Sequence, residues 1–253
     1  MHKNCFSQIC LIFLLSVLFV SSACLVNPVK AEANVEVVSD VAYVGNLAMY
    51  VVGEVQNTGD QPVEYVEIAV TFYDSNDSVL ATDVGYSGVD VILPERKSPF
   101  SIVIVDDNVI ANFDHYSLSV SYETTVAIEE KLRIVSDTSS IDEHGGLKIA
   151  GEVENTANSD ATYVRVYATC YDESGNVVDM AVTNIDNGIP AGQTVTFEVT
   201  VYTEDLETIA SYELTPDSAE YAAIPEFSAI FMCLLVAPLV GLAVIVLRKK
   251  TNQ

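Results

Sequence analysis

GEVQNTGDQ, residues 53 to 61, recurs 98 positions later as GEVENTANS, residues 151 to 159. The match continues without a gap to at least residue 79 of the first copy. It pairs Tyr65-Val66 with Tyr163-Val164, and Tyr73-Asp74 with Tyr171-Asp172. A repeat of this length is too long for a solenoid unit and matches the size of a small domain. The sequence therefore predicts two copies of one domain, at 34–127 and 131–216.

Apolar residues in each copy recur with a period of two, which is typical of strands with one buried face. One face carries Val66, Ile68, Val70 and Phe72 in the first copy, and Val164, Val166, Ala168 and Cys170 in the second. QNTGDQP and ENTANSD supply turn-forming residues, and further turns follow at Pro94 and Pro190. About seven short strands per copy, without helical periodicity, predict an all-β fold of two tandem antiparallel immunoglobulin-like β-sandwiches.

Each copy resembles the FxLYD family of small extracellular β-sandwich modules from bacterial and archaeal surface proteins. The resemblance rests on the GEVxNTG hairpin and on a strand that ends in Tyr-Asp, here VTFYD at 70–74 and ATCYD at 168–172. The Phe of the family pattern is replaced by Val70 or Ala168, and its Leu by Phe72 or Cys170. The resemblance implies a fold and no activity, because the family has no agreed catalytic residues.

The N-terminal segment has the layout of a secretory signal peptide. Lys3 precedes an uncharged run from Cys5 to Val26, and small residues follow it. We expect residues 1–31 to be removed, with cleavage after Ala31 or, alternatively, after Ala33. SSAC at 21–24 also resembles a lipid-attachment box, although Ser21 stands where a large aliphatic residue is usual.

The C-terminal segment predicts a membrane anchor. Ser228 to Leu247 is a run of twenty residues without a charge, which is long enough to cross a bilayer as a helix, and Pro238 is tolerable there. The basic residues of the tail at 248–253 should stay in the cytoplasm. We therefore expect a single-pass type I protein of the cell membrane, with both repeats outside and a linker at 217–227.

IPEF at 224–227 allows two interpretations. With the apolar segment and the basic tail, it resembles the PEF-type sorting tails of archaeal surface proteins, in which a membrane transpeptidase cuts near the motif and transfers the ectodomain to another anchor. That resemblance implies a sorting role for Pro225, Glu226 and Phe227. Alternatively, Pro225 ends the linker and Phe227 is an interfacial aromatic residue of a retained helix.

Charge and cysteine content narrow the class of protein. All 36 Asp and Glu lie between Glu32 and Glu226 with only six Lys or Arg, which gives this segment a formal charge of −30. Such a surface excludes nucleic acid as a partner and favours solubility. Cys170 is the only cysteine expected outside the membrane after processing, so no disulfide can form within the repeats. It falls on the inward face, as a small core residue.

The residues that could carry chemistry are few. His115 and His144 lie in different repeats without a metal-binding motif, and no catalytic constellation is apparent, so we expect no enzyme, no cofactor and no metal centre. The Asp-rich turns DSNDS (74–78) and VDDN (105–108) leave Ca²⁺ open, although solvated turns explain them as well. Asn76 begins an N-x-[ST] sequon and is a candidate glycosylation site.

Outward tyrosines suggest a binding surface. Tyr side chains combine a large contact area with a polar tip, so an exposed strip of them could bind sugars or protein. The members of the expected strip are Tyr65, Tyr73, Tyr163, Tyr167 and Tyr171. We expect a non-catalytic, membrane-anchored cell-surface protein that acts as an interaction, adhesion or cell-envelope module, with envelope proteins or glycans as partners. The alternative is a carbohydrate- or solute-binding surface protein accessory to a transporter.

Overall fold

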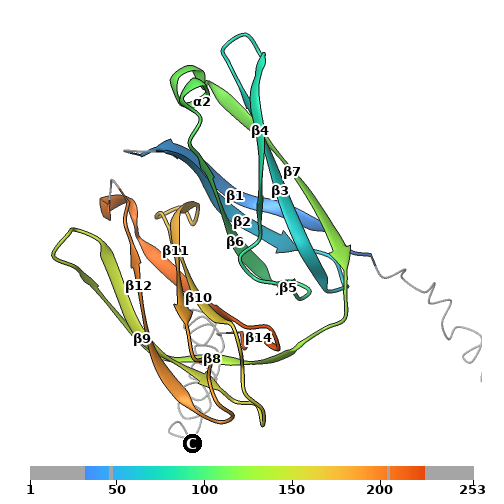
Figure 1. Cartoon of the computed structure of the whole chain (residues 1–253), viewed down its shortest axis with the longest axis vertical. Coiled ribbons are helices and arrows are strands. Elements are labelled where there is room, and N and C mark those ends of the chain that lie inside the picture. Colours follow the sequence, from blue (N-terminus) through green and yellow to red (C-terminus); the bar gives the residue numbers. More distant parts are fainter. Residues whose placement is uncertain (1–31, 46–47, 204–205, 226–253) are drawn as a thin grey trace, which may run out of the picture. The chain divides into compact units, whose positions relative to one another are not determined.

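The computed structural model describes residues 32–45, 48–203 and 206–225 (Figure 1). This part of the chain is all-β, and its sheets are antiparallel except for one short parallel pairing. The predicted signal peptide, transmembrane segment and cytoplasmic tail lie outside the described residues, as do Glu226 and Phe227. None of the described helices is long and apolar enough to span a bilayer.

Residues 33–124 form a β-sandwich-like unit, called here the first sandwich. One sheet has the order β1 (Val35–Val44), β2 (Met49–Asn57), β6 (Lys97–Ile104). The other has β4 (Val79–Tyr86), β3 (Val63–Tyr73) and β7 (His115–Thr124), with β5 (Val91–Ile92) also paired to β3. A short helix, α2 (Asp107–Asn112), precedes β7. The two sheets enclose one core that includes Met49, Val51, Ile68, Phe72 and Phe100.

Residues 129–225 form the second sandwich from the equivalent strands. One sheet has the order β12 (Thr194–Val201), β9 (Leu147–Asn155), β8 (Glu129–Ile141), β14 (Tyr221–Ala223). The other has β11 (Val177–Ile185), β10 (Val164–Tyr171) and β13 (Ser211–Asp217), and a 3-10 turn, η1 (Leu206–Thr208), precedes β13. Its separate core includes Leu132, Ile149, Val166, Cys170 and Phe197. The predicted inward faces of β3 and β10 are therefore confirmed.

The glycine of the repeated phrase makes room for an aromatic ring. A Cβ at Gly53 would lie 2.5 Å from the carbonyl oxygen of Ser39 and 2.6 Å from Cζ of Phe100. A Cβ at Gly151 would meet Ser136 and Phe197 in the same way, at 2.5 and 2.7 Å. A register shift of the neighbouring strand lies next to each glycine, opposite Glu54 and Val55 in the first copy and opposite Glu152 and Val153 in the second. Only glycine leaves room at these positions for both the carbonyl oxygen of the neighbouring strand and the phenylalanine ring.

The asparagine of the repeated phrase stabilises the loop that follows it through side-chain hydrogen bonds. Asn57 is fully buried, and its Nδ2 donates to the carbonyl oxygens of Gln61 (2.7 Å) and Ile92 (2.9 Å), while its Oδ1 accepts from the Gly59 amide (3.0 Å). Asn155 makes the three equivalent bonds, to Ser159, Ile189 and Ala157. A buried amide with every bond made stabilises one loop conformation. GEVxNT is therefore a structural motif of each sandwich.

The expected linker at 217–227 is partly wrong, because residues 221–223 are strand β14. β14 pairs in parallel with β8, and the Ile224 amide donates to the Leu132 carbonyl oxygen at 2.7 Å. Ser218 Oγ accepts from the Tyr221 amide at 2.9 Å and turns the chain into β14. Three residues are too few to show a period of two, so this strand left no signal in the sequence.

Candidate functional site at the junction of the sandwiches

The outer face of β1 and β2 packs on the outer face of β10 and β11, and this contact is called here the junction. Its apolar centre joins Val52 of the first sandwich to Tyr171 and Val177 of the second. Partly buried side chains surround that centre: Val41, Tyr43, Tyr50 and Met180. Strand faces that the alternation alone would leave in solvent are thus buried, because each sandwich covers the other.

A buried carboxylate lies beside the apolar centre. Glu54 is only 3% exposed; its Oε1 accepts from the Tyr171 hydroxyl at 2.6 Å and its Oε2 pairs with Lys97 Nζ at 2.9 Å. Lys97 also lies over the Tyr171 ring, 5.6 Å from the centroid. Burial and the bond to Glu54 raise the pKa of Tyr171 above its usual value, so its hydroxyl stays a donor. Burial likewise raises the pKa of Glu213.

A second polar cluster centres on Arg165. Its Nη2 lies 2.7 Å from Oδ1 of Asp90, in the first sandwich, and 2.7 Å from Oδ2 of Asp217, in the second. Asp217 is fully buried, and burial, with the nearby charge of Asp90, raises its pKa to about 7 against the opposing effect of Arg165. Tyr167 beside Arg165 donates to the Gly88 carbonyl oxygen at 2.6 Å.

Further bonds cross the junction. Tyr43 donates to Asp179 Oδ1 at 3.1 Å, and the Val177 amide donates to Ser39 Oγ at 2.8 Å. Arg96 forms an ion pair with Glu130. Polar pairs of this kind favour one relative orientation of the sandwiches, because a slip would leave charges unpaired. Among the described residues, Arg165 Nε and Asp217 Oδ1 are buried without a hydrogen-bond partner of their own. The arrangement can hold two sandwiches rigidly, and its tyrosine, carboxylate and guanidinium groups do not form a nucleophile and base pair.

Differences between the two copies explain why, within the described residues, the first copy uses one outer face for the junction and the second copy uses the other. The apolar junction residues of the first copy align with polar or smaller residues of the second: Val41 with Thr138, Tyr43 with Ser140, Tyr50 with Lys148 and Val52 with Ala150. On the junction face of the second sandwich, Tyr167 and Met180 align with Ala69 and Thr82 of the first copy. Glu152, the counterpart of Glu54, is exposed. The two copies thus carry one matched pair of faces between them.

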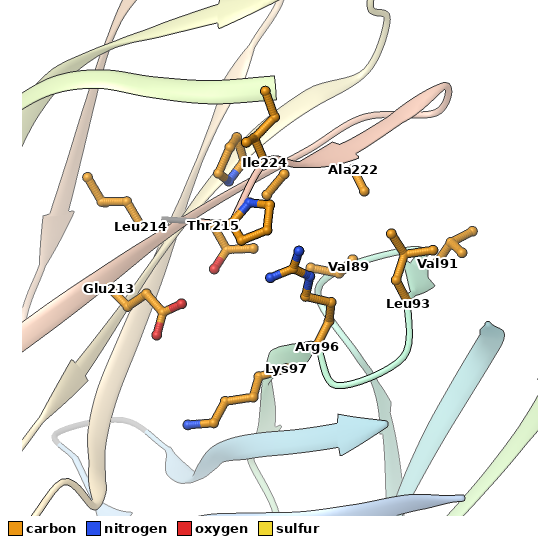
Figure 2. A pocket seen from close by; sticks show the side chains of 13 residues that line it. Val89, Val91, Leu93, Arg96, Lys97, Glu213, Leu214, Thr215, Ala222 and Ile224 are labelled. Atoms are coloured by element: carbon orange, nitrogen blue, oxygen red, sulfur yellow. The ribbon is translucent and has the colours of Figure 1, made fainter. Parts of the chain in front are cut away.

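A small cavity of about 120 Å³ lies at the edge of the junction (Figure 2). Arg96 and Lys97 line it from the first sandwich, and Glu213 and Ile224 from the second. Pro225, the first residue of the predicted sorting motif, is part of its wall. The cavity is mostly bordered by aliphatic side chains, and both basic groups are already paired with carboxylates.

The structure does not assemble the predicted tyrosine strip. Tyr167 and Tyr171 are 5% and 8% exposed, because the first sandwich covers their face of β10. Tyr73 is half-buried and stacks on His115, with ring centroids 5.0 Å apart. Only Tyr65 and Tyr163 are largely exposed. The prediction of five exposed tyrosines is therefore wrong for the two at the junction.

Of the two Asp-rich segments predicted as turns, 74–78 is a turn, but 105–108 leads into helix α2, which begins at Asp107. Asn76 is exposed in the β3–β4 turn, where Asp74 accepts the amides of Asn76 (2.8 Å) and Ser78 (2.9 Å). These backbone bonds lower the pKa of Asp74. Asp106 caps helix α2. Within the described residues, no group of three or more His, Cys, Asp or Glu is placed to hold a metal ion.

Cys170 and the two histidines are isolated from one another. Cys170 is fully buried in the second core, and burial raises the pKa of its thiol to about 12. His115 is exposed beside Asp114 in the first sandwich, and His144 is exposed beside Glu143 in the second. Sequence reasoning missed the junction residues Glu54, Asp90 and Arg165. The sequence signal for the junction was a contrast between the copies, because each copy has one outer face whose junction residues are replaced by polar or smaller residues in the other copy.

Comparison with known proteins gives no family. No family model matches the chain, and no curated protein matches it. Among solved structures, a transglutaminase from red sea bream is similar over 76% of this chain and 30% of its own, with 10% identity and a TM-score of 0.23. A β-glucuronidase of glycoside hydrolase family 2 is similar over 70% and 24%, with 12% identity and a TM-score of 0.26. This chain spans less than a third of either structure.

Proposed function

We propose that this chain is a non-catalytic, single-pass cell-surface protein whose two immunoglobulin-like sandwiches, of FxLYD type, act as one rigid extracellular interaction module. The β1-β2-β6 sheet facing the β4-β3-β7 sheet, repeated in the second copy, supports the immunoglobulin-like assignment. The apolar segment at 228–247 and the basic tail support the anchor.

The observation that carries the proposal is the junction itself. Glu54, Tyr171, Asp90 and Arg165 are committed to contacts between the sandwiches and to no reaction centre. Strand β14 holds the chain to the second sandwich up to Ile224, four residues before the apolar segment begins at Ser228. An anchor attached so closely would present both sandwiches at a fixed height and orientation, as an adhesion or envelope module requires.

The anchor is tested with the full chain expressed in cells. We expect the protein to remain in the membrane pellet after alkaline carbonate extraction, and external protease to digest the sandwiches in intact cells. A chain carrying Leu235→Arg and Leu239→Arg should be released, because two charges near the centre of the segment disfavour insertion. Recovery of the unaltered chain in the soluble fraction would refute the proposal.

The fate of the C-terminus is decided by mass spectrometry of the mature protein. An intact RKKTNQ end identifies a retained anchor, and a new end near Pro225 identifies processing of the sorting type.

A second candidate function, carbohydrate binding, is favoured by one observation. Tyr65 and Tyr163 are both exposed and both line open grooves beside the junction.

A further inference from the structure

Tyr65 and Tyr163 have an unusual backbone conformation at equivalent positions of the two copies. Their φ angles are 50° and 51°, in the left-handed region that a bulky residue rarely adopts. Their side chains are 69% and 84% exposed, so no core contact compensates for the strain. The next residues, Val66 and Val164, are buried. The kink turns each valine inward. Gly or Asn would adopt the same backbone conformation with less strain, so packing of the valine does not explain why an exposed tyrosine stands at both positions.

Both tyrosines line a groove at the junction, called here the junction groove. Its smaller lobe, of about 430 Å³, is lined by Tyr65, Tyr86 and Asp90 among others, and its larger lobe, of about 750 Å³, by Tyr163, Arg165 and Asp90. Asp90 borders both lobes. The Ala219 amide, at the smaller lobe, donates to the Thr162 carbonyl oxygen, at the larger, at 3.2 Å. The lobes therefore adjoin, with residues of both sandwiches in their walls, and each has the size of a ligand site.

The groove walls are fixed before any ligand arrives. Asp90 is paired with Arg165 at 2.7 Å. Thr162 donates from its amide and its hydroxyl to the two carboxylate oxygens of Glu220, at 2.7 and 2.6 Å. Tyr86 donates to Glu67 at 3.0 Å. A site held in this way loses little conformational entropy on binding.

We propose that the junction groove binds an extended oligosaccharide of neutral or cationic sugars, with Tyr65 and Tyr163 as the stacking surfaces. The apolar C–H faces of a pyranose ring pack on an aromatic face, and two such rings beside one groove suit a chain of several sugars. Exposed Asn184, Asp186 and Asn187 supply donors and acceptors for hydroxyl groups. Carboxylates outnumber the single guanidinium, so anionic sugars are disfavoured.

A glycan fits the groove better than a peptide does. Apart from Tyr163, the larger lobe offers only Val164 and Ile185 as apolar side chains, and Val164 is buried in the core. A peptide in the larger lobe would lack the apolar recesses in which its side chains are usually anchored. The smaller lobe is lined by Val66, Val89 and Val91, of which Val66 and Val89 are buried. The inference rests on the proposed function in one respect: the groove must lie outside the cell for external glycans to reach it.

The test is calorimetric titration of the full chain, purified in a detergent without a sugar headgroup. The probes are chitohexaose (neutral), the chitosan hexamer (cationic), a hyaluronan hexasaccharide (anionic) and hexalysine. We expect the first two to bind and the hyaluronan fragment not to bind. Tyr65→Asn and Tyr163→Asn should each weaken binding about tenfold, because a stacking surface is lost. Both should raise the melting temperature, since Asn tolerates positive φ.

Tyr202→Asn is the matched control, because Tyr202 is 62% exposed in the second sandwich and does not line the groove. Its affinity should equal that of the unaltered chain. The proposal is overturned if neither the neutral nor the cationic hexasaccharide binds, or if binding survives both groove substitutions. Tighter, tyrosine-dependent binding of hexalysine would overturn it in favour of a peptide site. Membrane extraction and protease accessibility do not depend on these tyrosines, so a failed anchor and a failed groove are told apart.

Discussion

The hydroxyl oxygen of Tyr171 lies 2.6 Å from Oε1 of Glu54, a residue 117 positions earlier in the chain and in the other sandwich. Each member has a counterpart in the repeat that makes no such contact: Glu152 is exposed, and Tyr73 bonds Ser117 instead. The same residue type, in the same strand position, is therefore a junction residue in one copy and a surface residue in the other. This duplication supplies internal controls for the energetics of the junction.

Replacing Glu54 should destabilise the protein, and replacing Glu152 should not. Glu54→Ala leaves Lys97 without its carboxylate and leaves the Tyr171 hydroxyl with only its longer bond to Glu213, at 3.4 Å. We expect a loss of about 2 kcal/mol, at the low end for buried pairs, because Lys97 is about half exposed and Tyr171 keeps one acceptor. For a protein of this size that corresponds to about 4–8 °C in melting temperature. Thermal unfolding followed by circular dichroism measures it. Equal effects of Glu54→Ala and Glu152→Ala would contradict the buried role of Glu54.

Stability should fall with rising pH because of Asp217. Folding raises the pKa of this carboxyl from 3.8 to about 7, so folding favours its protonated form. The contribution is full below about pH 4 and is lost as the pH rises through 7. We expect Asp217→Asn to make the decline of melting temperature between pH 4 and 7 shallower. Slopes are compared rather than absolute values, because the substitution also weakens the pairing with Arg165.

Other carboxyl groups with shifted pKa values also contribute to the dependence of the melting temperature on pH. Burial also raises the pKa of Asp179 and of Glu213, so these groups act in the same direction and the slope of the variant should not reach zero. Backbone hydrogen bonds lower the pKa of Asp74 and Asp142, and side-chain and backbone bonds to Asn176 lower that of Asp172. Those three groups act in the opposite sense at lower pH. An unchanged slope in Asp217→Asn would show that the buried carboxyl is not the source.

Cys170 should be inert in the folded protein. Its thiol is fully buried with a pKa of about 12, so at pH 8 only about one molecule in ten thousand carries the reactive thiolate. N-ethylmaleimide should leave Cys170 unmodified in the native chain and modify it in urea, as read by mass spectrometry of the peptide that contains it. Val182→Cys, at a 47% exposed position of the same sandwich, should be modified in both states. Native modification of Cys170 would show that the core opens.

The sequence predicted the internal structure of each sandwich well, because that structure leaves periodic signals. The alternation of Val66, Ile68 and Val70 fixed the inward face of β3, and the phrase around Asn57 identified a hairpin loop. Strand β14 was not predicted, because three residues are too few to show a period of two. The left-handed backbone conformation of Tyr65 was not predicted either, since nothing in the sequence favours that conformation at a tyrosine.

The junction could not be predicted, because alternation tells which face of a strand leaves the core and not what covers that face. Tyr167 and Tyr171 are outward residues of β10, and solvent was the default environment for them. The comparison of copies held the missing information. Val52 of the first copy stands where the second has Ala150, and Met180 of the second stands where the first has Thr82. Differences between repeats, rather than their agreement, marked the contact between them.

Exchanging one residue between equivalent turns should change stability in opposite directions. Glu95 and Gly192 occupy matching positions with φ of 64° and 67°, and both are exposed. Glu95→Gly should stabilise the protein by about 1 kcal/mol, because glycine adopts this conformation without a clash between Cβ and the backbone. Gly192→Glu should destabilise it by a similar amount. No atom outside the turn lies within 4 Å of a Cβ at Gly192, so the effect would come from the backbone alone. Melting temperatures that move in the same direction for both variants would rule out this explanation.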